Sequence, residues 1–124
     1  MLQKNSILIV DDSGTNLFLL QSLLEDEGYP VMITEDPGEG LKYIKNRSDI
    51  GLILLDIMMP KFDGFEFMKK LSDSGKLSQI PVIMVTARDD RQSQKQAMHM
   101  GATAYLTKPL NLNHVIKTIH EQLG

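Results

Sequence analysis

A long apolar run near the middle of the chain ends in one carboxylate, a proline and an Asp-Gly step. It reads Leu52-Ile53-Leu54-Leu55-Asp56-Ile57-Met58-Met59-Pro60-Lys61-Phe62-Asp63-Gly64. Apolar runs of this length between turn signals are typical of strands buried on both faces of a parallel sheet. A carboxylate directly after such a strand lies at the edge where open α/β sheets place their ligands. Asp56 is therefore the first candidate for a functional residue.

Short apolar runs alternate with helical patterns along the whole chain. The β-branched and apolar runs predict strands at 7–10, 31–34, 50–55, 81–85 and 104–106. Helices are predicted at 14–27, after the capping residue Asp36, from Asp63 to a stop at Gly75, at 89–100 and after the capping residue Asn111. Strands that alternate with helices in this way form a parallel sheet with right-handed crossovers. The expected fold is an α/β doubly wound sheet of five strands with helices on both faces.

Helical spacing also predicts which side chains face the core. The expected core positions are Leu17, Leu20 and Leu24; Leu41 and Ile44; Phe65, Met68 and Leu71; and Leu112, Val115, Ile116, Ile119 and Leu123. The segment 89–100 is very polar by comparison. The first helix has more apolar residues than one buried stripe needs, and we expect part of this surplus, near Asp12, to be exposed and to dock a helix of a kinase or phosphotransfer protein.

Length and composition exclude several classes of protein. With 124 residues we expect one domain, 1–124, and with a net charge of -3 we expect no nucleic-acid binding. The absence of cysteine excludes disulfides and thiolate metal sites. No export signal and no run long enough to span a bilayer are visible, so the expected location is cytoplasmic, without membrane insertion. The histidines His99, His114 and His120 show neither metal-ligand spacing nor an acidic partner pattern, and we expect them on the surface.

Polar residues follow four of the predicted strands. They are Asp11 and Asp12, Asp56, Thr86 and Lys108. Because the carboxyl ends of parallel strands share one edge of the sheet, these side chains are expected to line one crevice. Three carboxylates there would repel one another unless a cation joins them, and oxygen ligands favour Mg²⁺. A carboxylate, a magnesium ion, a lysine and a hydroxyl together suit phosphoryl transfer.

The chain resembles the receiver domains of two-component response regulators, which have a flavodoxin-like fold. The residues that carry the resemblance are Val10-Asp11-Asp12, Asp56-Ile57-Met58-Met59-Pro60 with Asp63-Gly64, Thr86-Ala87, Gly101-Ala102 with Tyr105, and Lys108-Pro109. These motifs run from the first predicted strand to the last helix, so the resemblance covers essentially the entire chain.

The resemblance implies a role for each matching residue. Asp56 would accept a phosphoryl group from a sensor histidine kinase or a histidine phosphotransfer protein, and the domain would catalyse only its own phosphotransfer and autodephosphorylation. The implied ligands of Mg²⁺ are Asp11, Asp12, Asp56 and the backbone carbonyl of Met58. Thr86 and Tyr105 would form the switch, Lys108 would pair with the phosphoryl oxygens, and a cis peptide bond would precede Pro109. The output would be a changed surface of the fourth helix, fifth strand and fifth helix, read by a downstream protein or effector domain.

Other functions remain open at this point. A haloacid-dehalogenase-like phosphatase would also use an aspartyl nucleophile, but it needs a second aspartate at the position of Met58. A flavodoxin-like electron carrier needs aromatic residues to flank its flavin, and the seven Phe and Tyr residues are not well placed for this. The chain could also be a receiver excised from a larger hybrid kinase or effector-bearing regulator.

Overall fold

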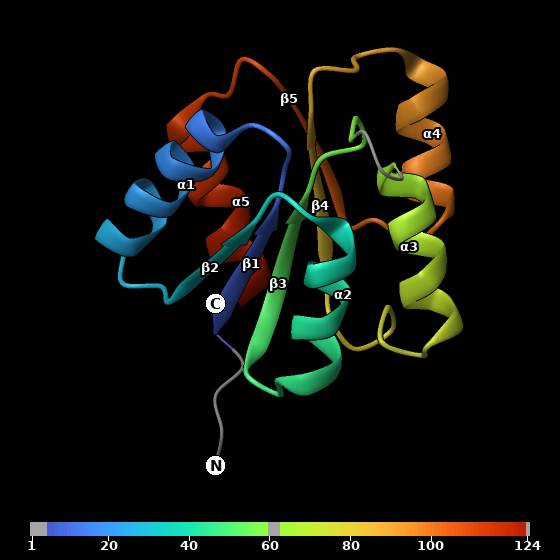
Figure 1. Cartoon of the computed structure of the whole chain (residues 1–124). Coiled ribbons are helices and arrows are strands. Elements are labelled where there is room, and N and C mark those ends of the chain that lie inside the picture. The colour runs from blue at the N-terminus through green and yellow to red at the C-terminus, as the bar shows by residue number, and fades with distance from the viewer. Residues whose placement is uncertain (1–4, 60–62, 124) are drawn as a thin grey trace.

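The computed structural model describes residues 5–59 and 63–123, which form a five-stranded sheet covered by helices on both faces (Figure 1). The strands are β1 (Ser6–Val10), β2 (Val31–Thr34), β3 (Ile50–Leu55), β4 (Val82–Thr86) and β5 (Ala104–Thr107). The helices are α1 (Gly14–Asp26), α2 (Pro37–Asn46), α3 (Gly64–Asp73), α4 (Arg91–His99) and α5 (Leu112–Leu123). Every predicted element is present, and the bounds differ by only a few residues.

The strands lie in the order β2-β1-β3-β4-β5, and all neighbouring pairs are parallel. The predicted doubly wound α/β fold is therefore confirmed. The chain moves outward from β1 to β2, then crosses back over β1 to β3 and continues in the other direction. The order reverses between β1 and β3, and such a reversal point opens a crevice at the carboxyl ends of the strands.

Alternation along the central strands divides the interior into two cores. In β1, Ile7 and Ile9 belong to the core under α1 and α5, whereas Leu8 and Val10 belong to the core under α2, α3 and α4. Successive side chains of a strand point to opposite faces, so a strand buried on both faces must be apolar throughout. All residues of β1, β3 and β4 are buried, which explains why the sequence showed unbroken apolar runs there.

Local signals in the sequence set the helix ends. The side chains of Ser13, Asp36, Asp63, Asp90 and Asn111 each accept a hydrogen bond from a backbone N–H in the first turn of the following helix. Such caps satisfy N–H groups that have no partner within the helix. Three glycines that follow helices have positive φ angles of 78–109°. This left-handed conformation is strained for other residues, so these glycines end their helices cleanly.

Two predicted core faces were partly wrong. In α3 the fully buried aromatic residue is Phe67, not Phe65, which is only half-buried. In α5, Leu112 is 37% exposed and Thr118 is buried instead. Phe67 lies one helical turn before Leu71 and next to Met68, so a stripe through Phe67 fits the same apolar pattern as a stripe through Phe65. Leu112 is the first residue of its helix, whereas Val115 and Ile119, which are buried, lie one and two turns further on.

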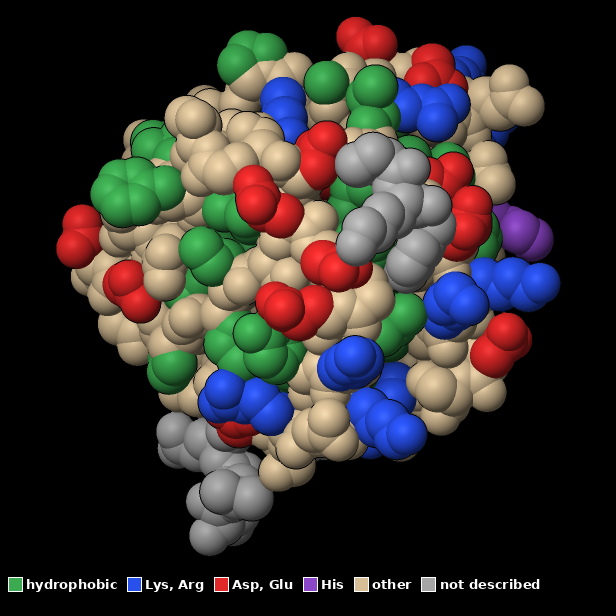
Figure 2. Space-filling view, in the orientation of Figure 1, with side chains coloured by type: hydrophobic (Ala, Val, Ile, Leu, Met, Phe, Trp, Pro, Cys, Tyr) green, Lys and Arg blue, Asp and Glu red, His purple; other side chains and the backbone are tan. Residues whose placement is uncertain are grey.

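The outer surface is uneven in charge. Figure 2 shows acidic side chains gathered across the middle of one face and Lys and Arg side chains gathered below them, over the lower ends of α2 and α3. Among the described residues, no helix has both the length and the apolar character needed to cross a membrane.

Candidate functional site

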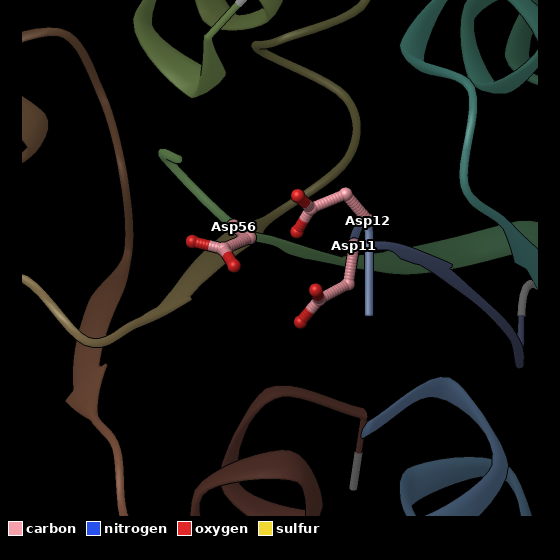
Figure 3. A group of neighbouring side chains, drawn as sticks. All are labelled: Asp11, Asp12 and Asp56. Carbon is pink, nitrogen blue, oxygen red and sulfur yellow. The ribbon is translucent and has the colours of Figure 1, made fainter. Parts of the chain in front are cut away.

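Three carboxylates meet where the strand order reverses. Asp11 and Asp12 follow β1, Asp56 follows β3, and the N–H of Asp56 donates to the carbonyl of Val10 over 3.0 Å. Each aspartate offers one oxygen, and these three oxygens lie within 4.8 Å of one another (Figure 3). Asp11 and Asp56 are only 2% and 4% exposed, whereas Asp12 is open to solvent. The structure thus brings the three predicted aspartates together.

Lys108 reaches the same cluster from the end of β5. Its Nζ donates to Oδ2 of Asp11 over 2.9 Å and to Oδ2 of Asp56 over 3.0 Å. The backbone is held in place by a hydrogen bond from the N–H of Lys108 to the carbonyl of Thr86, at 2.8 Å. The peptide bond between Lys108 and Pro109 is cis. One ammonium group therefore bridges two buried carboxylates.

Burial and hydrogen bonding act against each other in this cluster. Burial raises the pKa of Asp11, and the charge of Asp56 raises it further. The hydrogen bonds from Lys108 and from the N–H of Ser13 lower this pKa but do not outweigh the effect of burial. Burial disfavours the Lys108 ammonium, but the hydrogen bonds to Asp11 and Asp56 outweigh it and raise the pKa of Lys108. The two carboxylates share one lysine while repelling each other, so the site has a deficit of positive charge.

Asp56 and the residue after it, Ile57, lie close against the start of α3. Oδ1 of Asp56 accepts a hydrogen bond from the N–H of Met58 over 3.0 Å, and the N–H of Gly64 donates to the carbonyl of Ile57 over 2.8 Å. A Cβ atom at Gly64 would lie 2.7 Å from the carbonyl oxygen of Asp56. The close approach requires glycine here. Pro60, which the sequence analysis placed in the loop after Asp56, lies outside the described residues.

The two predicted switch residues lie on the strands that follow β3 in the sheet, Thr86 at the end of β4 and Tyr105 on β5. Thr86 is fully buried, and its hydroxyl accepts a hydrogen bond from the N–H of Arg88 over 3.3 Å. The Tyr105 hydroxyl donates to the carbonyl of Arg88 over 2.6 Å, while the ring is half-buried against the α2–α4 core. Burial and the nearby Asp90 raise the pKa of Tyr105. The contacts of Arg88 with Thr86 and Tyr105 were not predicted, because they use backbone atoms that every residue possesses.

The cluster suits a hard divalent cation. All side-chain atoms of the cluster that could bind a metal ion are carboxylate oxygens. Two of the three carboxylates are buried, and one lysine forms ion pairs with both of them. Oxygen ligands of this kind are preferred by Mg²⁺, and a divalent charge would offset the remaining repulsion. These ligand atoms therefore fit the magnesium ion that was expected from the sequence.

The histidines lie outside this site. His99, His114 and His120 are all exposed, as predicted. No sequence pattern indicated the acidic neighbour of His120, whose Nε2 lies 3.4 Å from Oε1 of Glu27 and whose Nδ1 lies 2.7 Å from the Tyr29 hydroxyl. These partners are more than 90 residues away in sequence, and only the fold brings them together.

Comparisons with known proteins agree with this geometry. The chain is 37% identical over 118 residues to the protein PilH of Pseudomonas aeruginosa, covering 95% of this chain and 97% of PilH. A CheY-like response regulator receiver domain from Methanospirillum hungatei superposes with a TM-score of 0.87 at 35% identity, covering 99% of this chain and 94% of that one.

A second solved structure contains a partner. It is the co-crystal structure of the Saccharomyces cerevisiae histidine phosphotransfer protein Ypd1 with the receiver domain of Ssk1, and it matches with a TM-score of 0.88 at 26% identity, covering 99% of this chain and 91% of that one. The family model for the response regulator receiver domain matches residues 7–120. This match favours a receiver over the phosphatase and the electron carrier. The chain belongs to the family of response regulator receiver domains of two-component signalling.

Proposed function

We propose that residues 1–124 act as one phosphorylation-switched receiver in the cytoplasm, with Asp56 as the phosphoacceptor. The observation that carries the proposal is the bridge from Lys108 to Asp56 and Asp11, at 3.0 and 2.9 Å, beside the third carboxylate of Asp12. The donor would be the phosphohistidine of a sensor histidine kinase or of a histidine phosphotransfer protein. The product would be a surface that a downstream protein or an effector domain recognises.

The proposed transfer exchanges one bond to phosphorus for another. A carboxylate oxygen of Asp56 bonds to phosphorus as the phosphorus–nitrogen bond of phosphohistidine breaks, and the histidine nitrogen leaves with the electron pair. Lys108 lies where its ammonium can pair with an oxygen of the incoming group, and charge stabilisation of this kind is the main contribution of proteins to phosphoryl transfer. Attack by water on the acyl phosphate then returns Asp56 and inorganic phosphate, which is the expected autodephosphorylation.

The proposed magnesium ligands are Asp11, Asp12, Asp56 and the backbone carbonyl of Met58. When bound, Mg²⁺ would neutralise negative charge on the phosphoryl oxygens. Asp12 is the exposed carboxylate of the set, so it is the carboxylate that an ion arriving from solvent can reach first.

The proposed output depends on Thr86 and Tyr105. The Thr86 hydroxyl would leave the N–H of Arg88 for a phosphoryl oxygen, and Tyr105 would then release the carbonyl of Arg88 and turn inward. Both hydrogen bonds meet at one residue, so a movement at Arg88 would affect both. The neighbouring α4 buries only Ser93 and Ala97. A helix with so few buried side chains can shift at low cost.

We propose that the phosphodonor docks on α1. Phe18 and Leu19 on this helix are 70% and 45% exposed, although Leu17 and Leu20 beside them are buried. Exposed apolar residues of this size are suited to helix–helix recognition. The solved complex of the Ssk1 receiver domain with Ypd1 supports a phosphotransfer protein as one kind of partner. Unchanged hydrogen exchange of α1 on addition of the cognate donor would exclude this surface.

The test of the central proposal is incubation with a small phosphodonor and Mg²⁺, followed by intact-mass measurement. The wild type should gain one phosphoryl group, and Asp56→Asn should gain none. Asp12→Ala and Lys108→Ala should remain folded and lose most of the modification. Asp89→Asn, which changes an exposed carboxylate in the loop before α4, is the matched control and should be modified like the wild type. Equal modification of Asp56→Asn and the wild type would refute the assignment.

A further inference from the structure

A groove that the proposed phosphorylation chemistry does not use lies between α2 and α3. It encloses about 480 Å³. Its apolar part is formed by Leu41, Ile44 and Leu71, and lysines line it as well: Lys45, Lys70 and Lys76. Ile44 and Leu71 are fully buried members of the core, whereas Leu41 is half-buried. The groove is thus an apolar depression that opens to solvent between lysine side chains.

The charge around the groove contrasts with the rest of the chain. The chain has a net charge of -3, yet Lys42 and Lys69 add to the lysines of the groove on the same two helices. The acidic residues in the first turns of α2 and α3, Glu39 and Glu66, lie at the opposite helix ends, towards the strand ends with the aspartate cluster. Asp73, the last residue of α3, is the acidic residue of these two helices at the groove end, and the lysines there outnumber it. Figure 2 shows this separation, with Lys and Arg side chains gathered over the lower ends of the two helices.

We propose that this groove binds an amphipathic helix of a protein partner that carries acidic residues beside its apolar face. Because α2 and α3 cover the same face of a parallel sheet, they run in the same direction (Figure 1). A third helix can pack along a pair of neighbouring helices that are arranged in this way. Apolar side chains spaced by three or four residues would fill the depression. Carboxylates on either side of them would face the lysines.

Other occupants fit the groove less well. A flat anionic membrane would meet the lysines but could not fill the depression between them. A small anion would find no buried polar side chain in the apolar part, since Ile44, Leu41 and Leu71 form it. An amphipathic acidic helix satisfies both the apolar part and the charge.

This docking surface is separate from the aspartate cluster. The groove is lined by residues of the middle and end of α2, by the end of α3 and by the residues just after it, whereas α3 begins at Gly64 beside Asp56. Binding at the groove should therefore not require phosphorylation, and the proposal does not depend on the role of Asp56.

The test uses a synthetic helical peptide with leucines at helical spacing and glutamates elsewhere. A second peptide keeps the leucines and replaces each glutamate by lysine. Vesicles of phosphatidylglycerol form a third arm. Binding is measured by fluorescence anisotropy at low and high salt, and the site is located by amide shifts in NMR spectra of the ¹⁵N-labelled chain.

The acidic peptide should bind and shift amides of α2 and α3. The double variant Lys45→Glu/Lys70→Glu should weaken its binding by about tenfold, as expected for reversing two charges beside the contact. The matched control is Lys117→Glu, an exposed lysine on α5 across the sheet, and it should bind like the wild type, as should Asp56→Asn.

Several outcomes would overturn the proposal. The basic peptide could bind as tightly as the acidic one, or Lys117→Glu could lose as much affinity as the double variant. Amide shifts confined to α1 or to α4 and α5 would place the peptide elsewhere. Binding to vesicles without binding to the acidic peptide would make the groove a lipid-binding surface, and no binding to any probe would remove it as a docking site.

Discussion

Gly64→Ala is the substitution that best tests the packing behind Asp56. Gly64 is the first residue of α3, and its φ angle is not in the left-handed region, so alanine is compatible with the backbone conformation. By helix propensity alone the substitution would stabilise the chain, by at most about 1 kcal/mol. The new Cβ atom, however, would lie 2.7 Å from the carbonyl oxygen of Asp56 and 2.8 Å from Cα of Ile57.

The contacts of this Cβ atom set the expected magnitude. Both neighbouring atoms belong to the backbone, so no side-chain rotation can relieve the overlap. The distances must increase by at least 0.6 Å to reach ordinary contact, which begins at 3.4 Å. Overpacking of a tight interior typically costs about 1–3 kcal/mol. We therefore expect Gly64→Ala to lower the free energy of unfolding by up to about 2 kcal/mol after the gain in helix propensity is subtracted.

Gly14→Ala provides a matched control. Gly14 is also the first residue of its helix, but a Cβ atom there would meet only Oε1 of Glu35, at 3.4 Å. This is the end of a flexible side chain and can move away. Urea denaturation of both variants should show Gly14→Ala equal to or more stable than the wild type and Gly64→Ala less stable. Phosphorylation by a small donor should also be slower in Gly64→Ala, because relief of the overlap displaces the backbone of Asp56.

Two results would refute this reasoning. If Gly64→Ala were as stable as Gly14→Ala, the close approach of α3 to the end of β3 would not constrain residue 64. If Gly64→Ala were destabilised but phosphorylated at the wild-type rate, the strain would relax into α3 and leave Asp56 in place.

Three further predictions follow from individual contacts. Arg47 and the hydroxyl of Ser6 hold the pKa of Asp49 at about 2, below its usual 3.8. The ionised carboxylate therefore stabilises the folded chain by about 1 kcal/mol after allowance for solvent screening. This contribution is present above pH 4 and is lost as the pH falls through 2. Urea denaturation should therefore show Asp49→Asn less stable than the wild type at pH 6, with the difference shrinking as the pH falls through 2, and a difference as large at pH 2 as at pH 6 would contradict the assignment. Lys108→Ala should lower the free energy of unfolding by roughly 1–3 kcal/mol in EDTA, because it leaves two buried carboxylates without their cation. Addition of Mg²⁺ should restore part of this loss. A variant as stable as the wild type in EDTA would show that the lysine does not stabilise the cluster. Tyr105→Phe keeps the ring and removes the hydrogen bond to the carbonyl of Arg88, so thermal unfolding should show a loss of at most about 1 kcal/mol, whereas a loss of several kcal/mol would mean that the hydroxyl has other partners.

The order of the elements could be predicted from the sequence because strong local signals mark their ends. The caps of Asp36 and Asp63 are hydrogen bonds to residues two and three positions further on. The positive φ of Gly28 is likewise a local property of the backbone. Such signals depend little on the rest of the fold. The choice between Phe65 and Phe67 depends instead on the rotation of α3 against the sheet, and a helical pattern that fits both residues cannot decide it.

The sequence predicted that the residues at the ends of the strands line one site. It did not predict the contacts among their side chains. The positions of Asp11, Asp56 and Lys108 at one edge follow from the parallel sheet. The bridge from Lys108 to both carboxylates depends on side-chain conformations and on the path of the loop after β5. The contact between His120 and Glu27 was missed for a similar reason, since it joins two helix ends that are close only in the folded chain.

The two cores on either side of the sheet have a consequence for how this chain can change. Helix residues on opposite sides of the sheet belong to different clusters of buried side chains, so the effects on stability of substitutions at two such residues should add approximately. The helices of one layer can therefore be redesigned without repacking the other. The central strand β3 has no such freedom, because Leu52 and Leu54 serve one core while Ile53 and Leu55 serve the other. Engineering of new docking surfaces should start from the helices and leave this strand untouched.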